Sequence, residues 1–441
     1  AALRLEPDWA ADLAVWPLCR NLARAFRLAV PAVAPGVAAE AGATAVERLH
    51  VVGAGATGTA LAELAARHGL EVRLRETDPA ALAGSLRRLR ARIAAGGRPA
   101  PHEAAARLAR IRPALEPVGL RLADLAMEAV AEDLDVKRRV LGELEVRMRP
   151  EAVLVTGTDT LAVDELASGL RHPERFVGLH FLHPLPRRQV VEVVRGARTS
   201  AAALATAVAL ARRLGLVPVV VRDAPGFVVN RVVAAGLREA LHLLDDGYRV
   251  ADVDGELRGF GMAMGPFEAM DEMGLDAAAR LAAALARAFP ERFAPTAQLE
   301  ALTAAGRLGR GSGGGFYRYR GSRRVPDPQA GRIVGAVPRR RPAQPGALAE
   351  RVVLAMVNEA AWCLGDGVAA DAGAVDLALL RGADFPLFRG GPLRHADALG
   401  LARVEARLNA LRAERGERFR PAPLVARLAQ AGGTFTGPAA G

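Results

Sequence analysis

The residues Gly53-Ala54-Gly55-Ala56-Thr57-Gly58 form the most specific motif of this chain. They follow a β-branched run at 49–52 and open a segment of helical period at 59–68. Glycines at these positions permit a tight turn, a close approach of the backbone to a pyrophosphate, and close packing of a helix on a strand. The first N–H groups of such a helix favour the same phosphates. The motif therefore predicts a dinucleotide-binding α/β domain, with the cofactor contacted by Gly53, Gly55, Thr57 and Gly58.

A carboxylate follows at the spacing that such domains use for the ribose. Glu76 lies 23 residues after Gly53, at the end of the next predicted strand. A carboxylate there accepts hydrogen bonds from both ribose hydroxyls and would repel a 2′-phosphate, so the predicted cofactor is NAD rather than NADP. A glycine-rich turn in an unrelated α/β protein is the alternative interpretation.

Short β-branched runs alternate with segments of helical period through the first half of the chain. This alternation is typical of a parallel sheet built from βαβ units. After Pro225 we expect the strands to stop and helices to dominate. The predicted fold is α/β plus all-α, a Rossmann-type doubly wound sheet followed by helical domains. The expected strands are 49–52, 72–74, 127–130, 153–155, 176–181, 190–194 and 219–221.

Two helical stretches resemble each other, which indicates an internal duplication. Residues 230–247 (NRVVAAGLREALHLLDDG) align with residues 350–367 (ERVVLAMVNEAAWCLGDG). The matched pairs include Arg231 with Arg351, Glu239 with Glu359, Asp246 with Asp366, Asp271 with Asp397 and Gly274 with Gly400. We therefore expect a helical connecting segment and linker over 1–45, a cofactor-binding domain over 46–221, a first helical domain over 222–325, a linker over 326–346 and a second helical domain over 347–441.

Length and composition narrow the class of protein. The 441 residues exceed one ordinary domain of about 100–200 residues. Hydrophobic residues at 51% and charged residues at 24% are those of a globular protein and exclude a disordered or collagen-like chain. No apolar run reaches the ~20 residues of a membrane span. Cys19 and Cys363 are the only cysteines. That argues against a disulfide framework or a cysteine zinc site and favours a reducing compartment, the cytoplasm; no metal is expected.

The net charge of +11 raises the question of nucleic acid. The arginines are spread over helical segments with Ala, Leu and Glu, and aromatic residues make up only 4% of the chain. Basic blocks interleaved with aromatics are absent from the sequence, so we expect no nucleic-acid partner and interpret the charge as helix-face background with a bias toward anionic small molecules. Lys137 is the only lysine among the 59 basic residues, which suggests a place that a planar guanidinium does not fit.

Further segments carry a resemblance to a known family. In order they are EAVAE at 128–132 with Lys137, GLHFLHP at 178–184, VEV at 191–193, DAPGFVVNR at 223–231 and MGPFE at 264–268. With the glycine motif, this series resembles the L-3-hydroxyacyl-CoA dehydrogenase family from about residue 49 to 319. The second helical copy and the residues before 46 resemble the C-terminal portion of the multifunctional fatty-acid-oxidation α-subunit. In that subunit an enoyl-CoA hydratase domain precedes the dehydrogenase, and these residues contain none. Since Ala1 is not an initiator Met, the chain is compatible with being part of a longer protein.

The resemblance implies NAD-dependent oxidation of (S)-3-hydroxyacyl-CoA to 3-oxoacyl-CoA in fatty acid β-oxidation. His180 would be the general base, because imidazole titrates near neutral pH. The resemblance assigns Glu192 the role of orienting that ring, and the 12-residue spacing is compatible with two neighbouring strands joined by a turn. Asn230 would bind the substrate carbonyl oxygen; its alternative role is to cap a helix after Pro225.

The resemblance also implies further cofactor contacts. Lys137 would reach the ribose beside the nicotinamide. We expect the acyl chain between the sheet domain and the helices. The other residues implied to contact the cofactor are Val130, Ala131, Glu132 and His183.

Several positions depart from the family pattern. Asp159 stands where the family usually has a Ser whose hydroxyl binds the C3 oxygen of the substrate. An ionised Asp159 would oppose alkoxide character there and favour protonated His180. His183 replaces a common Asn, Thr57 a common Met, and His395 an aromatic residue of some multifunctional members.

Three hypotheses follow from these departures. The first is a working dehydrogenase for acyl-CoA substrates. The second is a weakened dehydrogenase domain that serves as a scaffold partner of a thiolase or a separate hydratase. The third is a dehydrogenase for 3-hydroxy acids that are not CoA esters. A homo-oligomer or a complex is expected in the first two cases.

Overall fold

The computed structural model describes residues 16–33, 42–95, 100–185, 188–321, 323–335 and 343–437. The chain divides into two compact units. A sheet unit comprises Ala29–Phe227, and a helical unit comprises Ala1–Leu28 together with Val228–Gly441. Part of the predicted connecting segment and linker, residues 1–15 and 34–41, lies outside the described residues.

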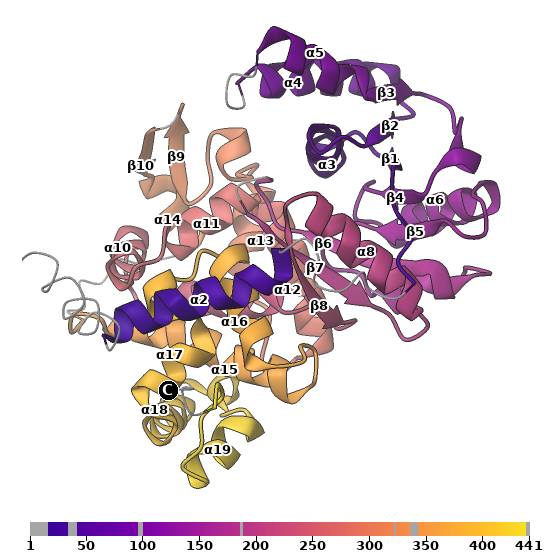
Figure 1. The fold of residues 1–441 in the computed structure, drawn as a ribbon. Helices are drawn as coiled ribbons and strands as arrows, with labels where there is room; N and C mark the ends of the chain where they lie inside the picture. The colour runs from indigo at the N-terminus through magenta and orange to yellow at the C-terminus, as the bar shows by residue number, and fades with distance from the viewer. Residues whose placement is uncertain are drawn as a thin grey trace, which may run out of the picture. The chain divides into compact units, whose positions relative to one another are not determined.

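The sheet unit is built on eight strands in the order β3-β2-β1-β4-β5-β6-β7-β8 (Figure 1). This order starts at β1 and runs outward in both directions, as in a doubly wound sheet. The loops that follow β1, β4 and β5 therefore share one end of the sheet. The strands are β1 (Arg48–Val52), β2 (Glu71–Arg75), β3 (Ile111–Ala114), β4 (Leu125–Glu128), β5 (Val153–Thr156), β6 (Phe176–Phe181), β7 (Val190–Arg195) and β8 (Val217–Arg222).

Two features of this sheet differ from the sequence prediction. β3 was not predicted, because Arg112 and Pro113 interrupt its apolar pattern; an edge position tolerates the missing N–H of the proline. The sheet is also mixed rather than parallel, because β7 runs antiparallel to β6. The connection between these two strands is too short for a parallel crossover, which needs a dozen or more residues.

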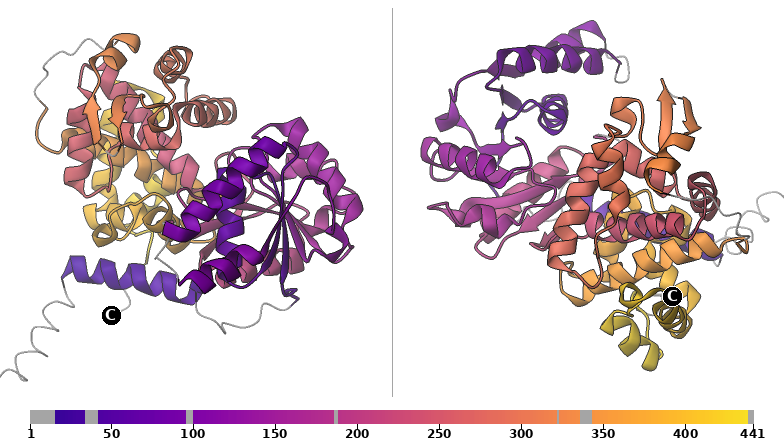
Figure 2. Two further views of the ribbon diagram at one scale, coloured as in Figure 1. Left: turned by 90° about the horizontal axis from the view of Figure 1, so that it is seen from above. Right: turned by 180° about the vertical axis from the view of Figure 1, so that it is seen from behind.

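Helices cover both faces of the sheet (Figure 2). On one face, side chains of α3, α4 and α8 join strand residues such as Val51, Met127 and Val155 in one buried core. α6 contacts β4 and β5 and packs on the other face. The near-continuous apolar burial of β4 and β5 follows from this coverage on both sides. The helices of this unit are α3 (Ala56–Arg67), α4 (Pro79–Ala95), α5 (Pro101–Ala109), α6 (Leu134–Arg147), α7 (Val163–Ala167) and α8 (Ala201–Arg213).

The helical unit contains two copies of one helix series. The first copy is α9 (Val229–Asp245), α10 (Val250–Phe260), α11 (Pro266–Met273) and α12 (Leu275–Ala288). The second copy is α15 (Ala347–Gly365), α16 (Ala372–Gly382), α17 (Pro392–Leu399) and α18 (Leu401–Arg415). The remaining elements are α2 (Pro17–Val33), α13 (Ala297–Ala304), α14 (Pro328–Ile333), α19 (Pro423–Gln430), β9 (Tyr317–Arg320) and β10 (Arg323–Pro326).

The β9–β10 hairpin corrects the expectation that strands end at Pro225. Its two strands pair antiparallel across a turn at Gly321, where the positive φ of 61° suits a glycine. α14 also lies inside the segment 326–346 that was predicted to be a linker, and residues 336–342 of that segment lie outside the described part. Asp327 caps α14 by accepting a hydrogen bond from Gln329 N, which explains why a helix begins there.

The two copies pack through reciprocal ion pairs between α9 and α15. Arg231 of α9 binds Glu359 of α15 and Asp366 directly after that helix. Arg351 of α15 binds the corresponding Glu239 of α9 and Asp246 directly after it. The residues matched by the sequence duplication therefore meet across an approximate two-fold axis, as in an isologous interface.

Two pairs of carboxylates, buried except for the half-buried Asp397, repeat the same local structure in both copies. Asp254 accepts hydrogen bonds from the first N–H groups of α11, and Asp376 does so for α17. Asp271 accepts from Phe316 N and Tyr317 N, and Asp397 accepts from Phe435 N and Thr436 N. The duplication thus extends to the pair of Asp254 and Asp376, which the sequence alignment did not include, and the matched pair of Asp271 and Asp397 makes equivalent hydrogen bonds.

α2 packs on the second helical copy. Asn21 donates a hydrogen bond to Phe388 O at 3.0 Å, and Arg24 pairs with the buried Asp376 at 2.9 Å. Among the helices described, none combines the length and hydrophobicity that a membrane span requires. Among the described residues, Cys19 and Cys363 form no disulfide.

Candidate functional site

The glycine loop lies between the end of β1 and the start of α3. A Cβ atom at Gly53, whose φ is +102°, would lie 2.4 Å from Ala129 O, and one at Gly58 would lie 1.9 Å from Gly53 O. These two positions therefore need glycine for the fold itself. A Cβ at Gly55 would meet no heavy atom within 4 Å. Gly55 thus leaves open space at the N-terminus of α3, where an anionic group is favoured.

Glu76 lies directly after β2, against this loop. Its Oε2 accepts a hydrogen bond from Ala54 N at 3.0 Å, and its Oε1 accepts one from Thr77 N at 2.9 Å. The carboxylate is partly exposed beside the open space at Gly55. An open glycine loop with an adjacent carboxylate fits a dinucleotide whose ribose hydroxyls donate to Glu76.

His180 and Glu192 form a buried pair on β6 and β7. They are direct partners in the register of these antiparallel strands, and His180 Nδ1 lies 2.6 Å from Glu192 Oε2. Because a carboxylate only accepts, Nδ1 carries a proton and Nε2 is the nitrogen that can take up or release one. Phe227 packs its ring 5.4 Å from the imidazole centroid, which fixes the ring from the side.

Asp159 follows β5 and faces the other nitrogen of His180. Its Oδ1 lies 3.7 Å from Nε2, and 54% of the Asp159 side chain is exposed. Burial opposes protonation of His180, but the hydrogen bond and charge of Glu192 and the charge of Asp159 outweigh it and raise the pKa of His180. Desolvation around the Asp159 carboxyl raises its pKa. The charge of His180 opposes this shift, and the charge of Glu132 adds to it.

His183 lies beside the glycine loop. Its Nε2 is 2.8 Å from Thr57 Oγ1, so the two unusual residues of the sequence form a hydrogen bond with each other. Burial lowers the pKa of His183, with Asp159 opposing and His180 reinforcing the shift. Two of the departures from the family pattern are therefore one local change, in which a Thr–His pair bridges the glycine loop and the segment after β6.

Lys137 is buried inside the sheet unit. Its side chain is 1% exposed, and Nζ lies 2.9 Å from Glu128 Oε2 and 3.2 Å from Glu132 Oε2. Burial opposes its charge, but the two carboxylates outweigh this effect and raise the pKa of Lys137. The ammonium group of Lys137 therefore holds the two carboxylates in place. The predicted contact with the cofactor ribose stays a prediction.

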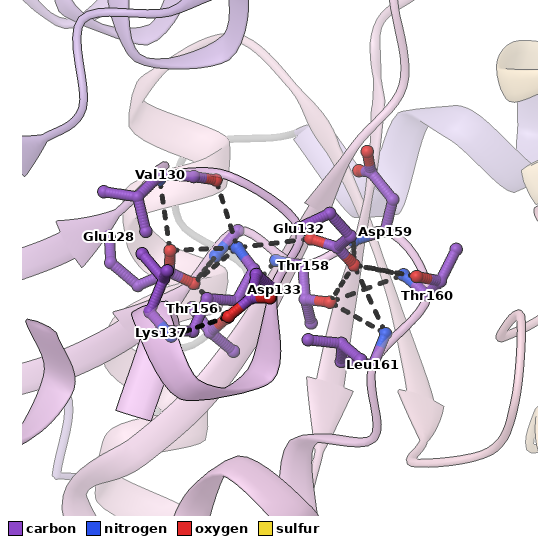
Figure 3. A network of polar contacts seen from close by, with 12 residues as sticks. Glu128, Val130, Glu132, Asp133, Lys137, Thr156, Thr158, Asp159, Thr160 and Leu161 are labelled. Carbon is purple, nitrogen blue, oxygen red and sulfur yellow. Dashed lines mark hydrogen bonds and ion pairs between the residues drawn. The ribbon is translucent and has the colours of Figure 1, made fainter. Parts of the chain in front are cut away.

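Glu132 orders the loop that carries Asp159 (Figure 3). Its Oε1 accepts hydrogen bonds from the backbone N–H groups of Asp159 and Thr160, at 3.0 and 2.8 Å. The hydroxyl groups of Thr158 and Thr160 donate to the same oxygen. Burial opposes ionisation of Glu132, but Lys137 and these donors outweigh it and lower its pKa. A chain of contacts therefore runs from Lys137 through Glu132 to Asp159.

Residues 48–224 match the family model "3-hydroxyacyl-CoA dehydrogenase, NAD binding domain". Residues 226–319 and 346–438 both match the C-terminal domain of the same family. The chain belongs to the 3-hydroxyacyl-CoA dehydrogenase family. The predicted family, the Rossmann-type fold and the NAD-binding domain are thereby confirmed.

Similar proteins include a subunit of a complex and a solved dehydrogenase structure. The fatty acid oxidation complex subunit alpha of Acinetobacter baumannii is 34% identical over 92% of this chain and 58% of its own length. The chain thus spans little more than half the length of the curated relatives it matches. The crystal structure of 3-hydroxybutyryl-CoA dehydrogenase from Escherichia coli K12 covers 88% of this chain and 99% of its own, with a TM-score of 0.78 and 27% identity.

A third comparison shows the fold alone. The dehydrogenase part of multifunctional enzyme 1 from C. elegans has 24% identity and a TM-score of 0.66, and covers 92% of this chain and 98% of its own.

The dehydrogenase sequence pattern did not reveal every residue of the site. Glu128 is fully buried, and accepts from Lys137 Nζ, Val130 N and the hydroxyl of Thr156. In the sequence, the place of Glu128 at the end of an apolar strand is the signal that could have identified it. Phe227 has a positive φ of 50°, which is unusual for an aromatic residue. Its position directly after Pro225-Gly226 is the signal that could have found it.

The remaining predicted residues lie in the turn after β4, in α9 and in α17. Val130 and Ala131 lie in the turn after β4, where Val130 O accepts from Lys137 Nζ at 3.5 Å and Ala131 O accepts from Asp133 N at 2.8 Å. Asn230 is the second residue of α9. It is not the helix cap, because Val228 occupies that position, so its alternative role is excluded. His395 is buried against Phe260 with ring centroids 5.3 Å apart.

Proposed function

We propose that this chain catalyses the NAD-dependent oxidation of (S)-3-hydroxyacyl-CoA to 3-oxoacyl-CoA, a step of fatty acid β-oxidation. The observation that carries the proposal is the buried His180–Glu192 pair at 2.6 Å, in the same unit as an open glycine loop with Glu76 beside it. Membership of the dehydrogenase family supports the substrate class.

The protein's own residues move the proton. His180 Nε2 takes the hydroxyl proton of the substrate while Glu192 keeps Nδ1 protonated and stabilises the imidazolium that forms. When NAD is bound, the hydride that leaves C3 passes to its nicotinamide. Asn230 binds the thioester carbonyl oxygen. In the reverse direction, imidazolium at position 180 returns the proton to the 3-oxo oxygen.

Asp159 supports a second candidate function. An anion 3.7 Å from His180 Nε2 stabilises the imidazolium, which is the wrong state for a base in oxidation. A weakened dehydrogenase that acts as a scaffold in a β-oxidation complex would tolerate this residue. The relatives named as complex subunits support a thiolase or a hydratase as the partner. The lack of a disulfide between Cys19 and Cys363 supports a cytoplasmic location.

Oxidation of NADH by acetoacetyl-CoA, followed by absorbance, tests both candidates. We expect turnover by the parent and a fall of about 10²–10⁴-fold in His180→Ala, because a general acid is lost. Turnover that survives His180→Ala would overturn the mechanism. NADH binding without turnover in the parent, together with turnover in Asp159→Ser, would support the scaffold role instead.

A further inference from the structure

The unusual residues Thr57 and His183 lie where the phosphates of the cofactor are expected. Thr57 is the second residue of α3, and a Cβ at the N-cap residue Gly55 would point into open space. α3 begins without a side-chain cap and without an acidic residue in its first turn. The first N–H groups of the helix and its positive end therefore favour an anion. In an NAD-binding domain, the anion at this position is the pyrophosphate of the cofactor.

Two sets of contacts hold His183 beside this helix turn. Its Nε2 lies 2.8 Å from Thr57 Oγ1. The segment that carries His183 is also tied to α4, because Arg92 donates a hydrogen bond to Leu185 O at 3.3 Å. Arg92 in turn pairs with Glu63 of α3 at 2.9 Å. An anion at the N-terminus of α3 would therefore lie next to this exposed histidine.

The protonation state of His183 sets the direction of its hydrogen bond with Thr57. A neutral imidazole with its proton on Nδ1 accepts the Thr57 hydroxyl proton at Nε2, so the hydroxyl presents only lone pairs to an incoming anion. An imidazolium donates from Nε2 to Thr57 Oγ1, and the hydroxyl proton can then point to a phosphate oxygen. A neutral ring with its proton on Nε2 would orient the hydroxyl in the same way but would bring no charge to the phosphates. Proton uptake by His183 thus adds both a positive charge and a hydroxyl donor.

The charges around His183 keep it neutral until an anion approaches. The charged groups that act on it are Asp159 after β5, His180 on β6, Arg92 on α4 and Arg188 before β7. Desolvation lowers the pKa of His183; Asp159 opposes this shift, and the three cations add to it. Since cations outnumber anions among these groups, the surroundings favour a polyanionic ligand. The negative charge of such a ligand raises the pKa of His183 again.

We infer that Thr57 and His183 bind the pyrophosphate of NAD(H) as a pair, and that His183 takes up a proton when the cofactor binds. The inference concerns the cofactor and does not depend on the proposed acyl-CoA substrate. The Asn that the family commonly has at position 183 does not titrate near neutral pH. The coupling of cofactor binding to proton uptake is therefore a property of this chain's own residues.

Calorimetric titration with NADH, in two buffers of different ionisation enthalpy, measures the protons that are taken up on binding. At a pH of about 7, we expect the parent to take up about half a proton more than His183→Asn or His183→Gln does. The Kd for NADH of the parent should rise about tenfold between about pH 6 and about pH 8, and most of this rise should be lost in both variants. His68→Asn is the matched control and should behave as the parent. His68 is an exposed histidine at the other end of α3, and desolvation lowers its pKa too.

Two further measurements test the pairing and the ligand group. Thr57→Val and His183→Asn should each weaken NADH binding, and the double variant should bind more tightly than the product of the two effects predicts, because the side chains act as one unit. ADP-ribose has the pyrophosphate but lacks the nicotinamide. Its binding to the parent should take up the same fraction of a proton as NADH.

Proton uptake by the parent equal to that of His183→Asn, or independent effects of the two substitutions, would overturn the inference. Uptake with NADH but none with ADP-ribose would contradict the assignment to the pyrophosphate. Free CoA also carries a pyrophosphate, and uptake by His183 with CoA but not with NADH would assign the pair to the substrate instead. A parent that does not bind NADH overturns the inference outright. In the first three cases, reduction of acetoacetyl-CoA by the parent leaves the proposed function standing.

Discussion

His180 and Glu192 face each other directly across β6 and β7, with Nδ1 and Oε2 2.6 Å apart and both side chains buried. The antiparallel direction of β7 makes this register possible after a connection of only a few residues. This pair affects the pH at which His180 loses its proton. An imidazole held by one buried carboxylate, with a second carboxylate at its other nitrogen, keeps its proton to a higher pH than free histidine does.

Replacing Asp159 with Ser should therefore shift the pH profile. The pKa of His180 is raised, so oxidation, which needs neutral imidazole, increases with pH as the imidazolium loses its proton. Reduction has the opposite sign, because it needs the imidazolium and declines above the same pKa. Asp159→Ser removes one of the two anions, so the pKa of His180 falls and both profiles move to lower pH. Initial rates of oxidation and reduction over a range of pH measure the shift.

At neutral pH, Asp159→Ser should also increase the rate of oxidation by about tenfold or more, because the serine hydroxyl donates a hydrogen bond to the developing alkoxide. Asp159→Asn separates the two effects, since it removes the charge without adding a hydroxyl group. Unchanged profiles in both variants would show that Asp159 does not influence the titration of His180.

Glu76 should determine the choice between NADH and NADPH. Its carboxylate is held beside Ala54 N at 3.0 Å and is positioned to accept from ribose hydroxyls. Glu76→Ala removes that acceptor and the repulsion of a 2′-phosphate. We expect NADH to bind about tenfold more weakly, as for the loss of a charge-assisted hydrogen bond, and NADPH to bind more tightly. Fluorescence titration with both nucleotides measures this, and an unchanged preference would place the ribose elsewhere.

Lys137 should contribute strongly to stability although it is near the candidate site. Lys137→Met leaves the fully buried Glu128 without its cation and removes the partner of Glu132. Breaking a buried ion pair in this way costs about 3–5 kcal/mol, because an uncompensated charge remains. Denaturant unfolding measures the loss. A Lys137→Met protein as stable as the parent would mean that the carboxylates bind protons in the folded state at no cost.

Lys137→Arg tests why the only lysine is here. It keeps the charge but places a planar group where the side chain is 1% exposed. We expect stability between those of the parent and Lys137→Met, and weaker NADH binding, because a displaced Glu132 no longer holds the Asp159 loop. A variant equal to the parent in both measurements would show that the site accepts either cation.

The contact between the two helical copies should depend on its buried ion pairs. Arg231 is 1% exposed and binds Glu359. Arg231→Met leaves that carboxylate with one cation fewer and should lower the free energy of unfolding by about 3 kcal/mol. The exposed pair of Arg280 and Asp276 is the control, and Arg280→Met should cost about 0.5 kcal/mol or less. Equal losses in the two variants would contradict a special role for the α9–α15 contact.

Much of the fold was predictable from local patterns. The glycine motif at 53–58 identified the first strand, its turn and its helix, because that turn requires glycine at two positions for steric reasons. The matched Arg, Glu and Asp residues of the duplication predicted two helical copies. β3 was missed because an edge strand buries little and tolerates Pro113. The β9–β10 hairpin was missed because its strands are short and rich in arginine, and only β9 has a buried face, formed by Tyr317 and Tyr319.

The sequence by itself determined which residue types are present for chemistry, and its motifs named His180, Glu192, Glu76 and Lys137. Their contacts were decided only by the tertiary structure. Lys137 is a buried partner of Glu128 and Glu132 because β4 ends beside the first turns of α6. The departures at Thr57 and His183 form one hydrogen bond because the loops after β1 and β6 meet in space. Distances between residues far apart in sequence depend on how strands and helices pack, and no local pattern contains them.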